Sequence, residues 1–75
     1  MKYSPGTLVK TSVVLQFFPV HPDLYSDSQY PPEIPSGTTG IIISQSNNGF
    51  IQWLVGEKIG WSNSSYIYTL QKIHQ

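Results

Sequence analysis

Few residues of this 75-residue chain have the chemistry of a catalytic or metal site. There is no cysteine, and the two histidines are His21 and His74. His21 and Asp23, with Asp27 four positions further on, give three candidate metal ligands on one segment. Zinc sites use such donors, but their usual Cys and His spacing is absent, and no Gly-x-Ser-x-Gly elbow supports a nucleophilic serine. We expect no catalytic residue, no metal and no cofactor.

The charged residues limit the kinds of partner that this chain could bind. Lys and Asp plus Glu balance to a net charge of zero, and there is no Arg. Without Arg forks for phosphates and base edges, and without excess positive charge, nucleic-acid binding is disfavoured. Asp23, Asp27 and Glu33 gather in residues 23–33 with no Lys among them. This acidic segment is either an ordinary solvated loop or a surface that selects a basic partner.

Length and hydropathy limit the organisation of the chain. Seventy-five residues suit one small domain, and we expect residues 1–75 to form it. No apolar run approaches the ~20 residues of a membrane helix, and the start of the chain lacks the pattern of a secretory signal. A surface rich in Ser, Thr, Asn and Gln suits a cytoplasmic protein without membrane contact.

The composition predicts an all-β fold. Ala, the best helix former, is absent, whereas Val, Ile, Thr and aromatic residues are abundant. We expect strands at about residues 7–15, 39–46, 50–55, 59–62 and 66–70. Turns are expected at Asn47-Asn48-Gly49 and Gly56-Glu57-Lys58, and one 3₁₀ turn near residues 63–65. The segment 16–36 holds five prolines, so it is an ordered excursion or a hairpin with frayed ends.

Alternation along these strands predicts the core. The residues expected to be buried are Val9, Val13, Ile42, Ile51, Trp53, Ile59 and Ile67. Those expected to be exposed are Lys10, Asn48, Glu57 and Lys58. Tyr66 and Tyr68 lie two positions apart, so they share one face if the last strand is regular. Five short strands with one long early loop favour a small closed barrel.

The second half of the chain resembles SH3-like domains, and bacterial SH3 domains in particular. Residues 49–61 match a strand that ends in a Gly-Lys turn and a Gly-Trp pair, and Ser64-Ser65-Tyr66-Ile67 matches the closing Ser-Ser-Tyr-aliphatic. Gly60, Tyr66 and Ile67 also keep the spacing of eukaryotic SH3 domains, although Asn63 and Ser65 stand where those domains usually have Pro and Asn. The resemblance implies a five-stranded SH3-like barrel in which Gln16–Glu33 is the long first loop.

The aromatic residues then indicate a binding surface. In SH3-like domains, the loop aromatics, the hairpin Trp and the closing Tyr converge on one groove. The resemblance assigns protein binding to Trp53 or Trp61 and to Tyr66, and more loosely to Tyr25 and Tyr30. Asp23, Asp27 and Glu33 are the acidic neighbours expected on the same surface. For Trp53, burial in the core is favoured over a place on this surface. We expect this surface between the Gln16–Glu33 loop and the Trp61–Tyr66 corner, with the turn at residues 47–49 on the opposite side.

These observations favour a non-enzymatic protein-binding module or accessory subunit. Its partner would be another protein, with a basic or proline-rich segment as one form of ligand. The alternatives are a cell-wall peptide-binding SH3 domain, a small virus-encoded inhibitor of a host protein and an RNA-binding SH3-like barrel. The sequence leaves the partner and the oligomeric state open.

Overall fold

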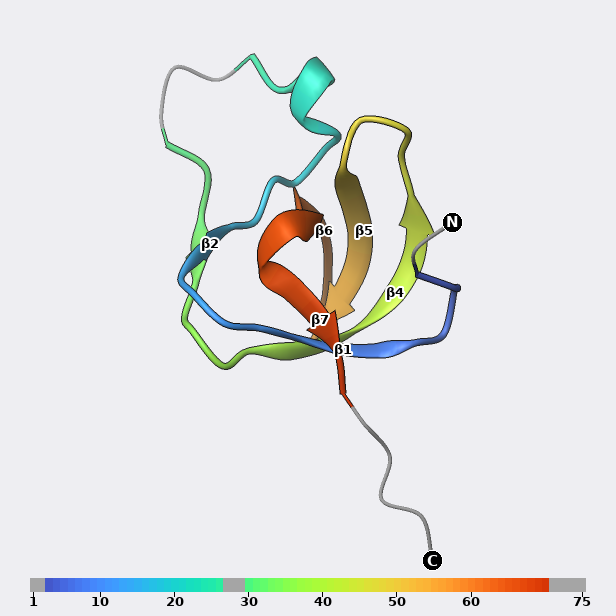
Figure 1. The fold of residues 1–75 in the computed structure, drawn as a ribbon. Helices are drawn as coiled ribbons and strands as arrows, with labels where there is room; N and C mark the ends of the chain where they lie inside the picture. The colour runs from blue at the N-terminus through green and yellow to red at the C-terminus, as the bar shows by residue number, and fades with distance from the viewer. Residues whose placement is uncertain (1–2, 27–29, 71–75) are drawn as a thin grey trace, which may run out of the picture.

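The computed structural model describes residues 3–26 and 30–70, and their regular structure is β-strand apart from two 3₁₀ turns (Figure 1). The elements are β1 (Leu8–Thr11), β2 (Leu15–Gln16), η1 (Pro22–Leu24), β3 (Glu33–Ile34), β4 (Thr39–Gln45), β5 (Phe50–Val55), β6 (Lys58–Asn63), η2 (Ser64–Tyr66) and β7 (Ile67–Thr69). The all-β prediction and the 3₁₀ turn before the last strand are confirmed.

Within the described residues, five strands form one antiparallel sheet in the order β6-β5-β4-β1-β7. The expected turns join β4 to β5 and β5 to β6, and each uses a glycine with positive φ, Gly49 at 88° and Gly56 at 62°. β2 and β3 pair separately as a two-stranded ribbon, through Leu15 opposite Ile34 and Gln16 opposite Glu33. The two ends of the proline-rich segment therefore pair as a short hairpin around the residues between Gln16 and Glu33.

The first predicted strand is broken in the structure. The pattern predicted one strand over residues 7–15, but β1 ends at Thr11 and β2 begins at Leu15. The Thr11 hydroxyl donates to the Val13 carbonyl at 2.8 Å and accepts from the Val13 N–H at 3.3 Å. These local bonds replace sheet pairing and turn the chain. Val13 is consequently exposed, and its predicted burial is wrong.

The core lies on the inner face of the sheet. Its buried apolar members are Tyr3, Val9, Leu15, Phe17, Ile42, Ile51, Trp53 and Ile67. Burial is thus confirmed for five of the seven expected core residues, with Val13 and Ile59 as the exceptions. Asn48, Glu57 and Lys58 are exposed as expected, whereas Lys10 is half-buried.

Ile59 is exposed because β6 turns different residues toward the core. On β6 the inward positions belong to Gly60 and Ser62, both buried, so Ile59 points outward. A Cβ built on Gly60 would lie 2.6 Å from the Phe17 ring. Because Gly60 has no side chain, the Phe17 ring occupies the space beside it. Ile59 is apolar, so its residue type did not indicate that the loop residue Phe17 would fill the core beside β6 in its place.

Tyr3 anchors the start of the described chain. Its N–H donates to Gln45 Oε1 at 3.1 Å, and its buried hydroxyl donates to the Ile67 carbonyl. Tyr3 thereby links the end of β4 to the start of β7. Burial raises the pKa of the Tyr3 hydroxyl above its ordinary value, because desolvation disfavours the phenolate.

No helix within residues 3–26 and 30–70 is long and apolar enough to cross a bilayer.

Replacing Ile51 with Ala should lower the free energy of unfolding by about 2–5 kcal/mol, because the side chain is fully buried and leaves a cavity. Ile59→Ala is the matched control on the outer face and should cost under about 1 kcal/mol. Urea unfolding followed by circular dichroism measures both. Equal losses for the two variants would contradict the assigned faces of β5 and β6.

The Tyr3 hydroxyl should make the stability of the fold fall in alkali. Because its folded pKa is raised, the neutral phenol's contribution is complete below the ordinary value near 10 and is lost as pH rises through the folded pKa. Thermal unfolding between neutral pH and strongly alkaline pH should therefore show a steeper decline for the unmodified chain than for Tyr3→Phe. Parallel declines would show that Tyr3 is not the responsible group.

Candidate functional site

A buried hydroxyl ties the long loop to the core. Trp53 Nε1 donates to Ser62 Oγ at 3.1 Å, and Ser62 Oγ donates to the Gln16 carbonyl at 2.8 Å. Trp53 and Ser62 are both fully buried. The indole N–H and the hydroxyl are each satisfied, as buried polar groups must be. The Ser62 hydroxyl therefore fixes the point at which the loop leaves β2.

Backbone bonds continue this attachment along the loop. Phe18 and Trp61 exchange N–H···O bonds in both directions at 2.8 Å. Phe17 lies inward against Trp53, with ring centroids 6.3 Å apart at 67°. Consecutive residues thus point to opposite sides, so Phe17 enters the core and Phe18 remains outside it.

Outside the core, aromatic rings hold the loop against the β5–β6 hairpin. Phe18 meets Tyr25 at 5.3 Å and Phe50 at 6.4 Å between centroids. His21 meets Phe50 at 5.9 Å and Trp61 at 4.8 Å. All four pairs are edge-to-face, the arrangement that the ring quadrupoles favour. We call Phe18, His21, Tyr25, Phe50 and Trp61 the aromatic cluster.

The outer end of the loop lies beside the β4–β5 turn. His21 Nδ1 accepts from the Asp23 N–H at 3.1 Å and caps η1. Asp23 Oδ2 accepts from Asn48 Nδ2 at 3.1 Å. Figure 1 shows η1 next to this turn. The expectation that the turn at residues 47–49 lies opposite the loop is therefore wrong.

The η2 corner forms a second rigid support. Asn63 Oδ1 accepts from the Ser65 N–H at 2.8 Å, which caps the 3₁₀ turn. Ser64 donates to the Gly49 carbonyl through its N–H at 2.9 Å and through its hydroxyl at 2.8 Å. Tyr66 belongs to η2 and not to β7, so it does not share a strand face with Tyr68. The corner presents the exposed Tyr66 ring.

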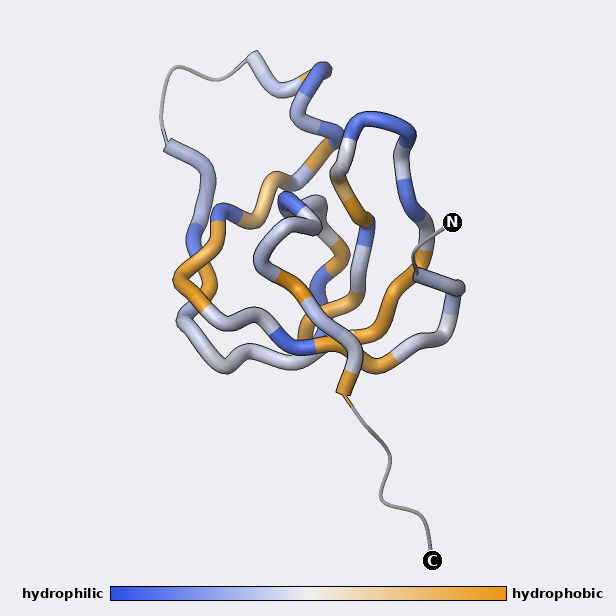
Figure 2. The backbone as a smooth tube through the Cα atoms, viewed as in Figure 1, coloured by the Kyte–Doolittle hydropathy of each residue, from blue (hydrophilic) through white to orange (hydrophobic). Residues whose placement is uncertain are grey.

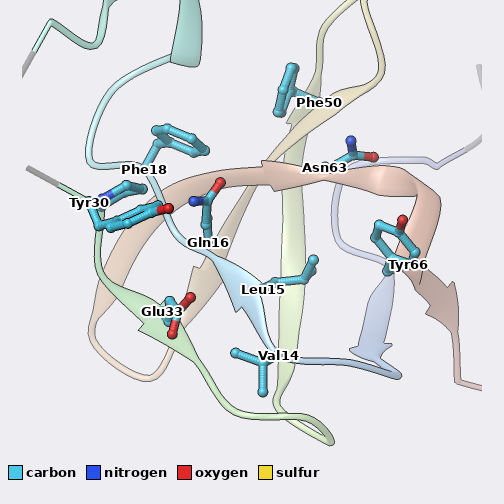
Figure 3. Close-up of a pocket in the computed structure, with 10 residues that line it drawn as sticks. Val14, Leu15, Gln16, Phe18, Tyr30, Glu33, Phe50, Asn63 and Tyr66 are labelled. Atoms are coloured by element: carbon cyan, nitrogen blue, oxygen red, sulfur yellow. The ribbon is translucent and has the colours of Figure 1, made fainter.

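A groove of about 660 Å³ separates the long loop from this corner. Its walls come from β2 and the residue before it, the loop, the start of β5, the end of β6 and η2 (Figure 3). The lining residues are Val14, Leu15, Gln16, Phe18, Tyr30, Pro31, Glu33, Phe50, Asn63 and Tyr66. Figure 3 shows Tyr30 and Tyr66 on opposite sides, with Leu15 and Gln16 between them.

The groove lining combines apolar surface with hydrogen-bonding groups. Tyr30 is 87% exposed and Tyr66 is 50% exposed, so both rings are open to a ligand. Gln16 and Asn63 contribute amides, and Glu33 is the one carboxylate among the described lining residues. Among the described lining residues there is no histidine, cysteine, lysine or serine.

The groove unites some of the predicted binding residues. Tyr30, Glu33 and Tyr66 line it. Tyr25 and Trp61 lie beside it in the aromatic cluster, where both are half-buried and support the wall.

The other predicted residues lie elsewhere. Asp23 is at the outer end of the loop, away from the groove lining. Trp53 is a core residue, because its ring is fully buried and its N–H is used by Ser62. Asp27 lies outside the described residues.

Several lining residues were not among those predicted. Phe18 and Phe50 are the largest, and both stand next to a buried residue, Phe17 and Ile51. Period-two alternation therefore contained the signal that each points away from the core. Val14 lines the groove because the chain turns after Thr11, which alternation could not reveal.

Metal binding finds no support in the described part of the chain. Residues 3–26 and 30–70 contain no group of three His, Cys, Asp or Glu side chains that could hold an ion. Of the three candidate ligands, His21 and Asp23 are engaged in the η1 cap, with Nδ1 and Oδ2 3.8 Å apart. Asp27 and His74 lie outside the described residues.

Comparisons with protein-family models, with curated proteins and with solved structures found no significant match.

Gly60→Ala should destabilise the fold by about 1–3 kcal/mol, because the new methyl group would overlap the Phe17 ring at 2.6 Å. A double-mutant cycle with Phe17→Leu, measured by urea unfolding, isolates this clash. The two changes together should cost less than the sum of the separate losses. Simple additivity would show that Gly60 and Phe17 do not compete for one space.

Proposed function

We propose that this chain is a non-enzymatic binding module with an SH3-like barrel fold, which docks on another protein through the groove. The observation that carries the proposal is the groove itself, formed where the long loop faces the η2 corner and lined by two exposed tyrosines. The sequence resemblance placed a binding surface between these same two segments.

The arrangement of elements supports the SH3-like assignment. A long excursion interrupts the chain between β1 and β4, and a 3₁₀ turn precedes the last strand. β7 pairs with β1, so the first and the last strand of the described chain are neighbours in the sheet. On the other side, β2 contacts β6 through Ser62 and the Phe18–Trp61 bridge. These contacts lay the β2–β3 ribbon and the start of the loop against the β6 edge of the sheet, an arrangement compatible with a barrel.

The groove chemistry favours a protein ligand in an extended conformation. Tyrosine offers a large apolar ring with a polar tip, which makes it an effective interface anchor at low entropic cost. The amides of Gln16 and Asn63 provide donors and acceptors for a peptide backbone. Glu33 adds one negative charge, so a basic or proline-rich segment suits the groove.

The rigidity of both walls supports binding rather than flexible closure. The loop wall is held by the Ser62 hydroxyl and the aromatic cluster, and the corner by bonds to Gly49. Pro31 is buried in the loop wall and has a fixed φ. A preformed groove loses little conformational entropy when a ligand docks.

Tyr66→Ala should weaken binding of a synthetic peptide that combines prolines with arginines by about tenfold or more, because an anchor ring is lost. Tyr68→Ala is the matched control, since Tyr68 is 47% exposed but lies outside the groove lining. Titration of ¹⁵N-labelled protein measures the affinity and maps the perturbed amides. Both variants are first compared with the unmodified chain by circular dichroism.

Two results would contradict the proposal. Equal weakening by the two tyrosine variants would show that the groove is not the contact surface. A full set of such peptides that leaves the groove amides unperturbed would exclude this class of ligand.

A further inference from the structure

The outer face of the sheet carries a row of aliphatic side chains that the groove does not use. Strand register places Leu8 opposite Ile41, Ile41 opposite Leu54 and Leu54 opposite Ile59. On the far side, the Leu70 N–H donates to the Leu8 carbonyl at 3.1 Å. These five residues form one row that crosses the whole sheet, and we call them the aliphatic stripe.

The stripe faces away from the core. Leu8 is 48% exposed, Ile41 41% and Ile59 52%, while Leu54 and Leu70 are half-buried. Next to four of the five stripe residues, at least one strand neighbour is buried, so these four side chains point outward; the buried neighbours are Val9, Gly40, Ile42, Trp53 and Gly60. Figure 2 shows hydrophobic colouring where β1 and β4 run side by side at the base of the molecule. None of the five residues lines the groove.

A contiguous aliphatic row is unlike scattered exposed residues. An isolated exposed leucine is ordinary, but a joined patch of a few hundred Å² is often an interaction site. Directly opposed residues on neighbouring strands have side chains in contact range, so this row is continuous. From the three strongly exposed members and their two half-buried neighbours, its accessible apolar surface is on the order of 300 Å².

We propose that the stripe is a self-association surface, through which two copies of this chain pack face to face as a two-fold dimer. An interface of standard size buries about 800 Å² per partner and has an apolar centre with a polar rim. The stripe supplies such a centre. The rows beside it supply a rim, with Tyr68, Lys10 and Thr39 on one side and Ser44, Gln52 and Trp61 on the other.

Charge favours a second copy as the occupant. The stripe itself is uncharged, and the chain has no net charge, so two copies do not repel one another overall. A two-fold axis that runs along the stripe places the stripes of the two copies against each other. The row that contains Lys10 in one copy then faces the row that contains Gln52 in the other. The two Lys10 ammonium groups then lie on opposite sides of the stripe. This proposal is independent of what the groove binds.

Sedimentation of the full chain over micromolar to near-millimolar concentrations tests the proposal. We expect a reversible monomer–dimer equilibrium. Leu8→Lys and Ile59→Lys should each weaken it by about tenfold or more, because a charge enters the apolar centre. Leu24→Lys is the matched control, since Leu24 on η1 is more exposed than any stripe residue and lies outside the stripe. Circular dichroism verifies that the variants are folded.

A second measurement does not depend on any variant. Amide shifts of the ¹⁵N-labelled chain should change with concentration at β1, β4 and the β5–β6 turn, and not at the groove. A chain that stays monomeric at every concentration overturns the proposal and leaves the stripe to a partner of different composition. Dimerisation that the two stripe variants leave intact, or shifts confined to the groove, overturns it equally.

Discussion

The Ser62 hydroxyl is the interaction on which the rest of this structure depends. It is the fully buried point where the core, the last long strand and the loop meet. An apolar residue there would leave both the Trp53 N–H and the Gln16 carbonyl without their partner, and each such loss costs about 1–3 kcal/mol. The same two hydrogen bonds of Ser62 fix where the loop begins. The position of the groove wall therefore depends on the need to satisfy buried polar groups in the core.

Small residues on β6 make this arrangement possible. Gly60 and Ser62 take the inward positions, and their lack of bulk leaves space for Phe17 and for the loop backbone. The loop thus fills a gap that a strand would otherwise fill with its own side chains. A long connection with five prolines is held in place by packing, although its sequence has little regular structure of its own.

Much of the sheet could be read from the sequence, since β4, β5, β6 and their turns follow from alternation and from glycine positions. The break after Thr11 could not, because it results from a hydroxyl bonded to its own backbone. The burial predicted for Ile59 was wrong because small residues, Gly60 and Ser62, take the core-facing positions of β6.

The candidate site was predicted at the level of segments rather than residues. The loop and the η2 corner do face each other across the groove, and three of the seven named side chains that the structure describes line it. Trp53 was expected in the core and was also named for the binding surface, because an indole suits both. Its buried hydrogen bond to a residue nine positions later decides between them.

The β5–β6 hairpin has a consequence for valency. Its first pair, Phe50 with Asn63, belongs to the groove, and its fifth pair, Leu54 with Ile59, belongs to the aliphatic stripe. Four residue steps along the strand separate the two pairs by about 13 Å. The two surfaces therefore use different residue pairs of the hairpin, with the Gln52 and Trp61 pair between them. Two chains joined at the stripe would present two grooves in a fixed orientation, so a ligand with repeated segments would bind the second groove at high effective concentration and gain avidity without any new contact.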